Sequence, residues 1–195
     1  MHPILNKNLF FVKEHIGMFK AANNYDIYDP ESQELILTCR EPNLSGLTKF
    51  FRFTGFKTAT PFNIEIKTAG GEKVLRVKRA TTIFFSTVEV FDENETLIGK
   101  FQQKFSLVGK FQVLNANDQF VCTLKGKWTG WNFKFVKDDI EYAHVTKKWS
   151  GIGKELFTTA DNYILEIEKS VPVDSPIRVL ILAAVMCVDM VLKEK

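Results

Sequence analysis

The sequence contains few histidines and cysteines, two residue types from which many catalytic and metal sites are built. Its 195 residues include only three histidines and three cysteines. It has no P-loop, no His-Glu-x-x-His motif and no dinucleotide fingerprint, motifs whose chemistry depends on fixed spacing. A catalytic triad needs a histidine beside a nucleophile and an orienting acid. Nothing in the local sequence around His2, His15 or His144 indicates one. We therefore expect a non-enzymatic protein without a cofactor.

Cysteine pairing is also missing. Cys39, Cys122 and Cys187 are odd in number and form no closely spaced pair, which is typical of free thiols in a reducing compartment. The first residues, MHPILNKNLFFVKEHIG, lack the basic start, long apolar run and cleavage site of a secretory signal. These features predict a cytoplasmic protein, which could also associate peripherally with the inner face of a membrane.

Strong net charge is absent as well, since the formal charge is only +3. Trp128, Trp131 and Trp149 could stack on bases. A nucleic-acid-binding surface over this length would nevertheless need more basic residues. The low net charge therefore argues against a nucleic-acid partner. Any preference for anionic ligands must come from a local patch.

No apolar run reaches the roughly 20 residues that span a bilayer. The longest, Val179 to Val188, is about half that length. It lies within IRVLILAAVMCVDMVL, which has almost no polar face, and such a helix must be buried. Asp174 and Ser175 could cap its start, with Pro176 in the first turn. The sequence predicts a buried helix over about 176–192, packed in the core of the protein.

Most of the remaining chain alternates between apolar and polar residues, the pattern of half-buried strands. Leu75 and Val77, for example, alternate with Arg76 and Lys78. The strands are separated by residues that favour turns. The predicted turns are Asp29-Pro30, Gly70-Gly71, Asp92 to Glu95, Asn115 to Asp118 and Asp138-Asp139. With a last unit, NYILEIEKSVPV, before the helix, these make six hairpin-like units, which correspond to about a dozen strands.

So many strands predict closure, because an open sheet would leave exposed edges. We expect a mainly β protein, a closed barrel of about 12 strands around the C-terminal helix. The interior of such a barrel is too wide for the strand side chains alone to fill, and the helix would fill the rest. No linker divides the chain, so residues 1–195 are predicted to form a single domain. The segment from Ser45 to Phe62 is the longest excursion. A buried strand is the favoured interpretation there, and an exposed edge contacting a membrane or a partner is the alternative.

The segment KKWSGIGKELFTTADNYILEI, residues 147–167, resembles one shared by phospholipid scramblases and their relatives. The matching features are Lys147, Trp149, Ser150-Gly151, Lys154-Glu155, Phe157-Thr158 and Ala160-Asp161-Asn162-Tyr163. The ending is also similar, with Asp174 before an apolar helix that carries Asp189. The resemblance covers about two thirds of the chain. It implies the tubby-like fold, shared with LURP-one-related proteins, in which a twelve-stranded barrel surrounds a hydrophobic C-terminal helix.

The resemblance also implies lipid-related functions, and the sequence departs from the family pattern in two of them. The stretch that can be palmitoylated in scramblases reads TTIFFSTVE here, without cysteine. Thr159 stands where the proposed calcium loop begins with an acidic residue. Asp161, Asn162 and Asp174 remain the candidate calcium ligands, with Glu166 and Glu168 on the wet face of a strand. These departures argue against both thioester anchoring and a calcium site.

Basic residues beside turns and tryptophans are the better functional candidates, because lysine and arginine neutralise phosphates. The candidate headgroup-binding residues are Arg76, Lys78, Arg79, Lys125, Lys127, Lys147, Lys148 and Lys154. The leading hypothesis is binding to anionic phospholipids or phosphoinositides at a membrane surface. The alternatives are a protein-interaction scaffold without lipid activity and a true scramblase whose helix inserts into the membrane.

Overall fold

The structure is a computed structural model of the chain. It describes residues 2–15, 24–42, 46, 48, 50, 60–81, 84–106, 109–127, 132–147 and 162–192, apart from the side chains of 189, 190 and 192. Twelve antiparallel strands form a closed barrel. Their bounds are β1 Leu9–Glu14, β2 Tyr25–Tyr28, β3 Leu35–Arg40, β4 Phe62–Thr68, β5 Lys73–Arg79, β6 Thr87–Asp92, β7 Leu97–Gln103, β8 Gly109–Asn115, β9 Phe120–Lys127, β10 Asn132–Lys137, β11 Ile140–Thr146 and β12 Asn162–Ile167. A short 3-10 helix, η1 (Pro3–Asn6), precedes them, and α2 (Ile177–Leu192) follows.

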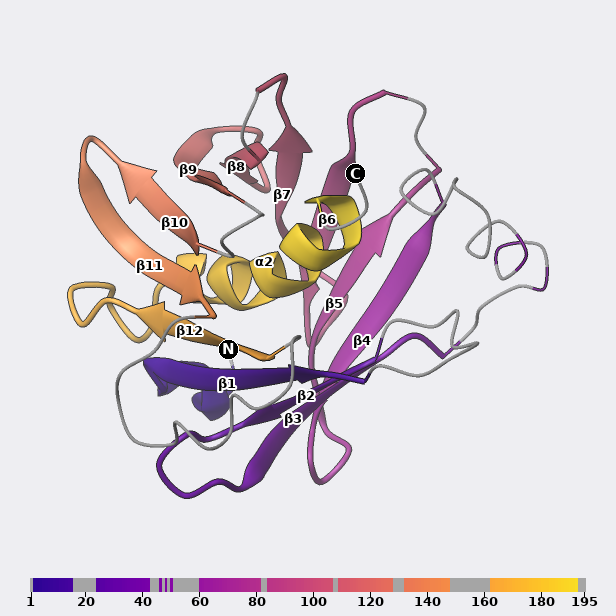
Figure 1. The fold of residues 1–195 in the computed structure, drawn as a ribbon, viewed down its shortest axis with the longest axis vertical. Helices are drawn as coiled ribbons and strands as arrows, with labels where there is room; N and C mark the ends of the chain where they lie inside the picture. The colour runs from indigo at the N-terminus through magenta and orange to yellow at the C-terminus, as the bar shows by residue number, and fades with distance from the viewer. Residues whose placement is uncertain are drawn as a thin grey trace.

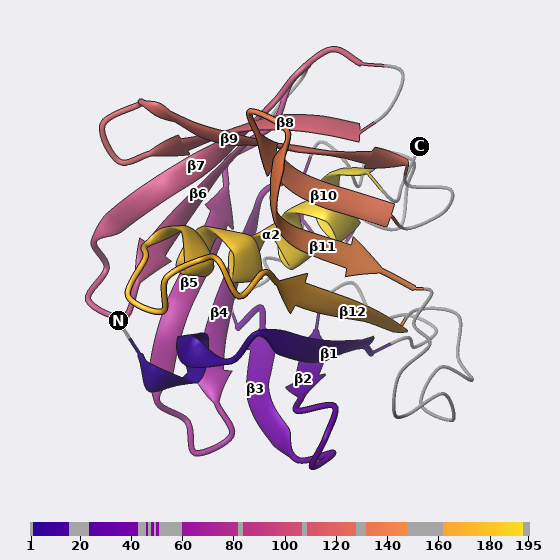
Figure 2. The same ribbon diagram turned by 90° about the vertical axis from the view of Figure 1, so that its left-hand side faces the viewer.

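Each strand pairs with its neighbour in the sequence, and β1 closes the ring by pairing with both β2 and β12 (Figures 1 and 2). In register, Phe11 lies opposite Ile164 on one side and Tyr28 on the other. Closure removes the free sheet edges that an open arrangement would expose. The predicted mainly β closed barrel with a C-terminal helix is confirmed.

The two ends of the barrel differ in their connections. At one end, which we call the tight-turn end, the strands are joined through 29–34, 69–72, 93–96, 116–119 and 138–139. At the other, the long-connection end, the strands are joined through 15–24, 41–61, 80–86, 104–108, 128–131 and 147–161. The five turns predicted from the sequence all lie at the tight-turn end.

Side chains stabilise the tight turns directly. Asp92 Oδ1 accepts hydrogen bonds from the backbone N–H groups of Asn94 and Thr96, at 2.9 and 2.8 Å. Asn115 Oδ1 does the same for residues 117 and 119, and Asp29 Oδ1 for residues 31 and 32. Such bonds offer the backbone a partner where the strand pairing ends.

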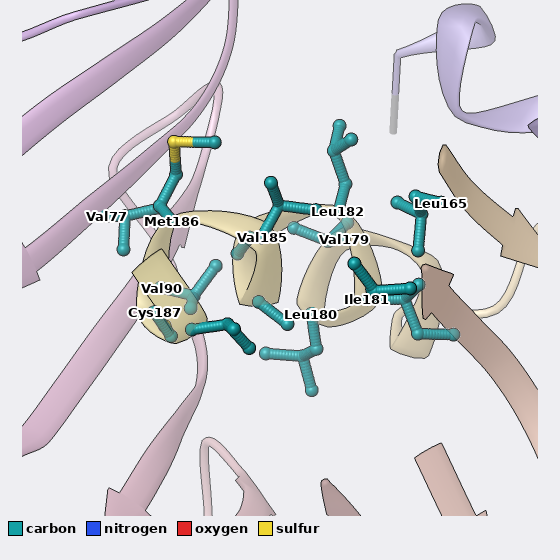
Figure 3. Packing of buried hydrophobic residues seen from close by; sticks show 14 of the residues in the cluster. Val77, Val90, Leu165, Val179, Leu180, Ile181, Leu182, Val185, Met186 and Cys187 are labelled. Carbon is teal, nitrogen blue, oxygen red and sulfur yellow. The ribbon is translucent and has the colours of Figure 1, made fainter. Parts of the chain in front are cut away.

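Helix α2 runs through the middle of the barrel, from the tight-turn end towards the long-connection end (Figure 2). It packs most closely against β5 to β8 and β12. Its residues from Val179 to Val188 are at most 3 % exposed, and they meet inward side chains such as Val77, Val90 and Leu165 (Figure 3). The helix is thus apolar on all sides because the barrel surrounds it on all sides.

The fit between helix and barrel leaves no room at Gly99 on β7. A Cβ atom built there would lie 2.2 Å from the carbonyl oxygen of Leu114 and 3.2 Å from Cδ2 of Leu180 on the helix. Backbone on one side and the helix on the other therefore require glycine at this position.

Arg178 fixes the start of the helix at the tight-turn end. Its side chain is fully buried, and its guanidinium donates to the carbonyl oxygens of Leu5, Val171 and Lys7, at 2.6, 3.0 and 2.7 Å, and to Asn8 Oδ1 at 2.7 Å. A buried charge is tolerated only when its donors are satisfied. Arg178 consequently ties α2 to the chain between η1 and β1.

The structure adds one strand to those read from the sequence and changes one expectation. Strand β1 was not predicted, since Phe10, Phe11 and Val12 are all buried and show no alternation. Within the segment from Ser45 to Phe62, the buried strand is wrong at Gly46, Thr48 and Phe50, which are helical. The rest of that segment before residue 60 lies outside the described residues.

Candidate basic face

Lysines gather on the outer wall of β8, β9 and β10. Lys110, Lys125, Lys127 and Lys134, which we call the basic face, point outward. The inward residues on these strands include Phe111, Leu124, Phe133 and Phe135, all fully buried. The alternation that buries the aromatic residues therefore places the lysines on one continuous surface.

The strand register sets three of these lysines in a row. Lys110 lies directly opposite Lys125, and Lys125 lies directly opposite Lys134. Directly opposed residues on neighbouring strands have Cβ atoms about 5 Å apart, and like charges there are destabilising. Lys134 is balanced by Glu141 at 2.6 Å. Among the described residues, Lys110, Lys125 and Lys127 make no ion pair.

Several basic residues elsewhere on the barrel wall are paired with carboxylates. Arg76 on β5 forms an ion pair with Glu95, as does Lys73, and the Arg76 guanidinium lies 4.5 Å from the centre of the Phe91 ring. Lys67 pairs with Glu65 at 2.7 Å and Lys100 with Asp118 at 2.5 Å. Lys78 is exposed but lies opposite Glu89 in register. Of the sequence-predicted residues, Lys125 and Lys127 belong to the basic face, and Arg76 and Lys78 do not.

The structure corrects the prediction that Arg79 binds headgroups at the surface. Arg79 is 1 % exposed and faces into the barrel. Its guanidinium donates to the carbonyl oxygen of Thr60 at 2.5 Å and to Ser86 Oγ at 3.3 Å, and it lies 4.8 Å from the centre of the Phe62 ring. The alternation of side chains along β5 explains this position, because Arg79 points to the same inward side as Leu75 and Val77. Arg79 therefore cannot meet a headgroup in this structure.

The remaining candidates fall at or beyond the ends of the strands. Lys147 is half-buried just after β11. Lys148, Lys154 and the proposed ligand Asp161 lie outside the described residues, as does the side chain of Asp189. Headgroup binding by the lysines and calcium binding by Asp161 therefore stay predictions.

The candidate calcium ligands are not brought together where they are described. Asn162 begins β12 at the long-connection end, and Asp174 follows that strand at the tight-turn end. A strand rises about 3.3 Å per residue, so β12 separates them by roughly 16 Å. A single site containing both is therefore wrong. The described residues contain no group of three or more histidine, cysteine or acidic side chains that could hold a metal.

Lys110 and Lys134 were missed in the sequence. Parity alone could have shown that both face outward, since Phe111 and Phe133 face inward. What the sequence could not supply is the register that sets Lys110, Lys125 and Lys134 in one row. That alignment depends on strand bulges, for example between Val113 and Leu114.

The described histidines are held by other side chains. His2 lies 3.2 Å from Glu72, His15 lies 2.7 Å from Asp26, and His144 lies 2.9 Å from Asn132 Oδ1. Asp26 also accepts a hydrogen bond from Arg40 at 2.5 Å. Burial would raise the pKa of Asp26, but the hydrogen bonds from Arg40 and His15 outweigh it, and the pKa is lowered from 3.8.

A surface pocket of about 530 Å³ lies at the tight-turn end. Carboxylates of Asp29, Glu31, Glu166 and Glu168 line it, together with Lys7 and Lys169. Lys7 is already bonded to Asp29 at 2.5 Å. The lining is thus net acidic, which disfavours an anionic ligand there.

The family model Scramblase matches residues 8–195, nearly the whole chain, so the protein belongs to the Scramblase family. A comparison with curated protein sequences found no match. Among the described residues, no helix combines the length and the apolar character needed to cross a membrane.

Proposed function

We propose that this Scramblase-family protein is a non-enzymatic protein that binds anionic phospholipid headgroups, phosphoinositides included, through its basic face. The observation that carries the proposal is the row Lys110, Lys125 and Lys134, three lysines set directly opposite one another on adjacent strands. Like-charge pairs in this position weaken a sheet. A phosphate-bearing surface would compensate for that repulsion.

The energetics favour a membrane surface as the partner. A lysine near an anionic leaflet contributes about 1 kcal/mol of binding free energy, and the effect fades within a Debye length. Several lysines on one wall therefore supply useful affinity, whereas the neutralised residues Lys67, Lys73 and Lys100 supply little. The proposed location is the cytoplasmic face of a membrane, where anionic lipids are concentrated.

In this proposal α2 stays inside the barrel. Its residues from Val179 to Val188 are buried against the strands, and Arg178 bonds the helix to the chain around η1. Insertion of the helix into lipid would break those bonds and leave the barrel without its filling. Headgroup binding at the outer wall needs neither change.

Flotation with vesicles tests the proposal. The full chain is mixed with phosphatidylcholine vesicles with and without phosphatidylserine or a phosphoinositide. We expect binding only to the anionic vesicles, weakening as salt is raised. The triple variant Lys110→Gln, Lys125→Gln, Lys127→Gln should bind about tenfold to a hundredfold more weakly.

The control loses the same charge elsewhere. Lys67→Gln, Lys73→Gln, Lys100→Gln removes three lysines that are paired with carboxylates. It should bind much more like the unmodified protein. Indifference to lipid charge, or equal weakening in both triple variants, would overturn the proposal.

A further inference from the structure

Exposed phenylalanines lie at the long-connection end of the barrel. Phe84 and Phe105 are each 87 % exposed, and Phe85 is 54 % exposed. They belong to two connections, β5 to β6 and β7 to β8, which leave neighbouring strands. We call Phe84, Phe85 and Phe105 the phenylalanine rim. Single exposed apolar residues are ordinary, but a group of large ones on adjacent connections marks an interaction site.

Hydrogen bonds hold the two connections together. The backbone N–H of Ser86 donates to Gln103 Oε1 at 3.0 Å, and the backbone N–H of Gln103 donates to the carbonyl oxygen of Ser86 at 2.9 Å. Ser86 follows Phe85 directly, and Gln103 precedes Phe105 by two residues. The rim is therefore one local surface.

The rim continues into the basic face. Lys104 adjoins Phe105, and its backbone N–H donates to the carbonyl oxygen of Lys110 at 2.9 Å. Lys110 opens the lysine row that runs across β9 and β10. Aromatic side chains that can enter a membrane interface thus lie beside lysines that can reach phosphates.

The tight-turn end also exposes apolar side chains, but their surroundings differ in charge. Ile140 follows Asp138 and Asp139, Val173 precedes Asp174, and Phe120 lies two residues after Asp118. An anionic surface repels the carboxylates of Asp138, Asp139 and Asp174, and Asp118 is already paired with Lys100. Charge complementarity therefore selects the long-connection end.

We propose that the phenylalanine rim inserts into the headgroup region of an anionic bilayer, so that the barrel docks with its long-connection end towards the membrane. This inference rests on the proposed function and adds the docking orientation and an apolar contribution to it. The lysines of the basic face then lie along the wall above the rim and contact phosphates from the side.

Site-specific labelling tests the orientation. Phe105→Cys and, as a matched control at the opposite end, Phe120→Cys are each coupled to an environment-sensitive fluorophore. The native thiols do not interfere: Cys39, Cys122 and Cys187 are buried, and burial raises the pKa of all three, that of Cys122 to about 12. The added cysteine is therefore the reactive one at neutral pH.

On phosphatidylserine vesicles we expect the label at 105 to shift to the blue and to be quenched by brominated lipid, and the label at 120 to show neither change. Phe84→Ala with Phe105→Ala should weaken vesicle binding by roughly tenfold. Phe120→Ala with Ile140→Ala should leave it unchanged.

The outcomes separate the two proposals. If the protein binds anionic vesicles but the label at 105 stays in water, or if the label at 120 responds equally, the docking orientation is wrong and headgroup binding stands. If vesicles of either charge bind equally poorly, both proposals fail. A phenylalanine-dependent contact with another protein in the absence of lipid would also overturn the insertion.

Discussion

At the tight-turn end of the barrel, side chains bond to the backbone of the turns, whereas the long-connection end exposes aromatic rings and adjoins lysines that lack a carboxylate partner within the described part of the chain. Asp29, Asp92 and Asn115 bond to the backbone of their turns, and Arg178 bonds the helix to the chain before β1. The lysine row instead places like charges together. The comparison associates the proposed site with the end that exposes charge and aromatic rings.

The largest expected effect concerns Arg178. Arg178→Met should lower the free energy of unfolding by about 3–5 kcal/mol, because four acceptors, two in buried and two in partly buried hydrogen bonds, lose their donor. Arg178→Lys should rescue it only in part, since an ammonium cannot reach the same acceptors. Denaturant unfolding measures both. Lys78→Met, at an exposed site, is the control and should change stability little, and an equal loss there would contradict the comparison.

Gly99→Ala comes next. The added methyl would meet the carbonyl oxygen of Leu114 and the side chain of Leu180, so we expect a loss of about 2–3 kcal/mol. Gly70→Ala is the matched control, because the nearest atom to its Cβ, Thr68 Oγ1, is 3.7 Å away. Thermal unfolding should separate the two variants clearly. Equal stability would mean that the barrel can expand around α2.

At the long-connection end, Asp26 should contribute less. Asp26→Asn removes the carboxylate that Arg40 and His15 bind, at a cost of about 1 kcal/mol at neutral pH for partners that are partly exposed. The pKa of Asp26 is lowered in the folded protein, so its contribution is present above the unfolded value of 3.8 and is lost as pH falls through the folded value. The stabilities of the two proteins should therefore converge in acid. A constant difference down to the lowest pH would contradict the assignment.

The smallest effect has the opposite sign. Lys125→Gln should raise the free energy of unfolding by about 0.5 kcal/mol, because it removes the like charge opposite Lys110 and Lys134. The same variant should bind anionic vesicles more weakly. Lys100→Gln, which breaks a pair with Asp118, should not gain stability. A loss of stability at Lys125 would remove the main support for the proposed site.

Much of the fold could be predicted because the local patterns agree with it. Alternation marked most of the strands, and Asp, Asn and Gly marked the tight turns. The apolar run from Val179 to Val188 predicted a helix buried on all sides. Strand β1 was not predicted, because Phe10, Phe11 and Val12 are all buried. The outer face of β1 is covered as well, since the centre of the Phe11 ring lies 6.1 Å from that of the Tyr28 ring. A strand buried on both faces does not alternate.

The candidate site was less predictable, because it depends on relations between strands. Lys125 and Lys127 were recognised as outward lysines, but their partners come from β8 and β10, whose register no local pattern encodes. Arg79 shows the opposite error. Its charge suggested the surface, while its parity with Val77 placed it inside, beside Thr60, Ser86 and Phe62. Asn162 and Asp174 were grouped as candidate calcium ligands because of the family resemblance, although a whole strand lies between them.

The position of α2 after all twelve strands has a consequence for biosynthesis. The element that fills the barrel is made after all twelve strands, and β1 must wait for β12 before the ring can close. Every strand therefore leaves the ribosome before its interior face has a partner. Contacts between distant parts of a chain form slowly and leave intermediates prone to aggregation. The barrel of this protein should therefore close around its helix only after translation has passed residue 192.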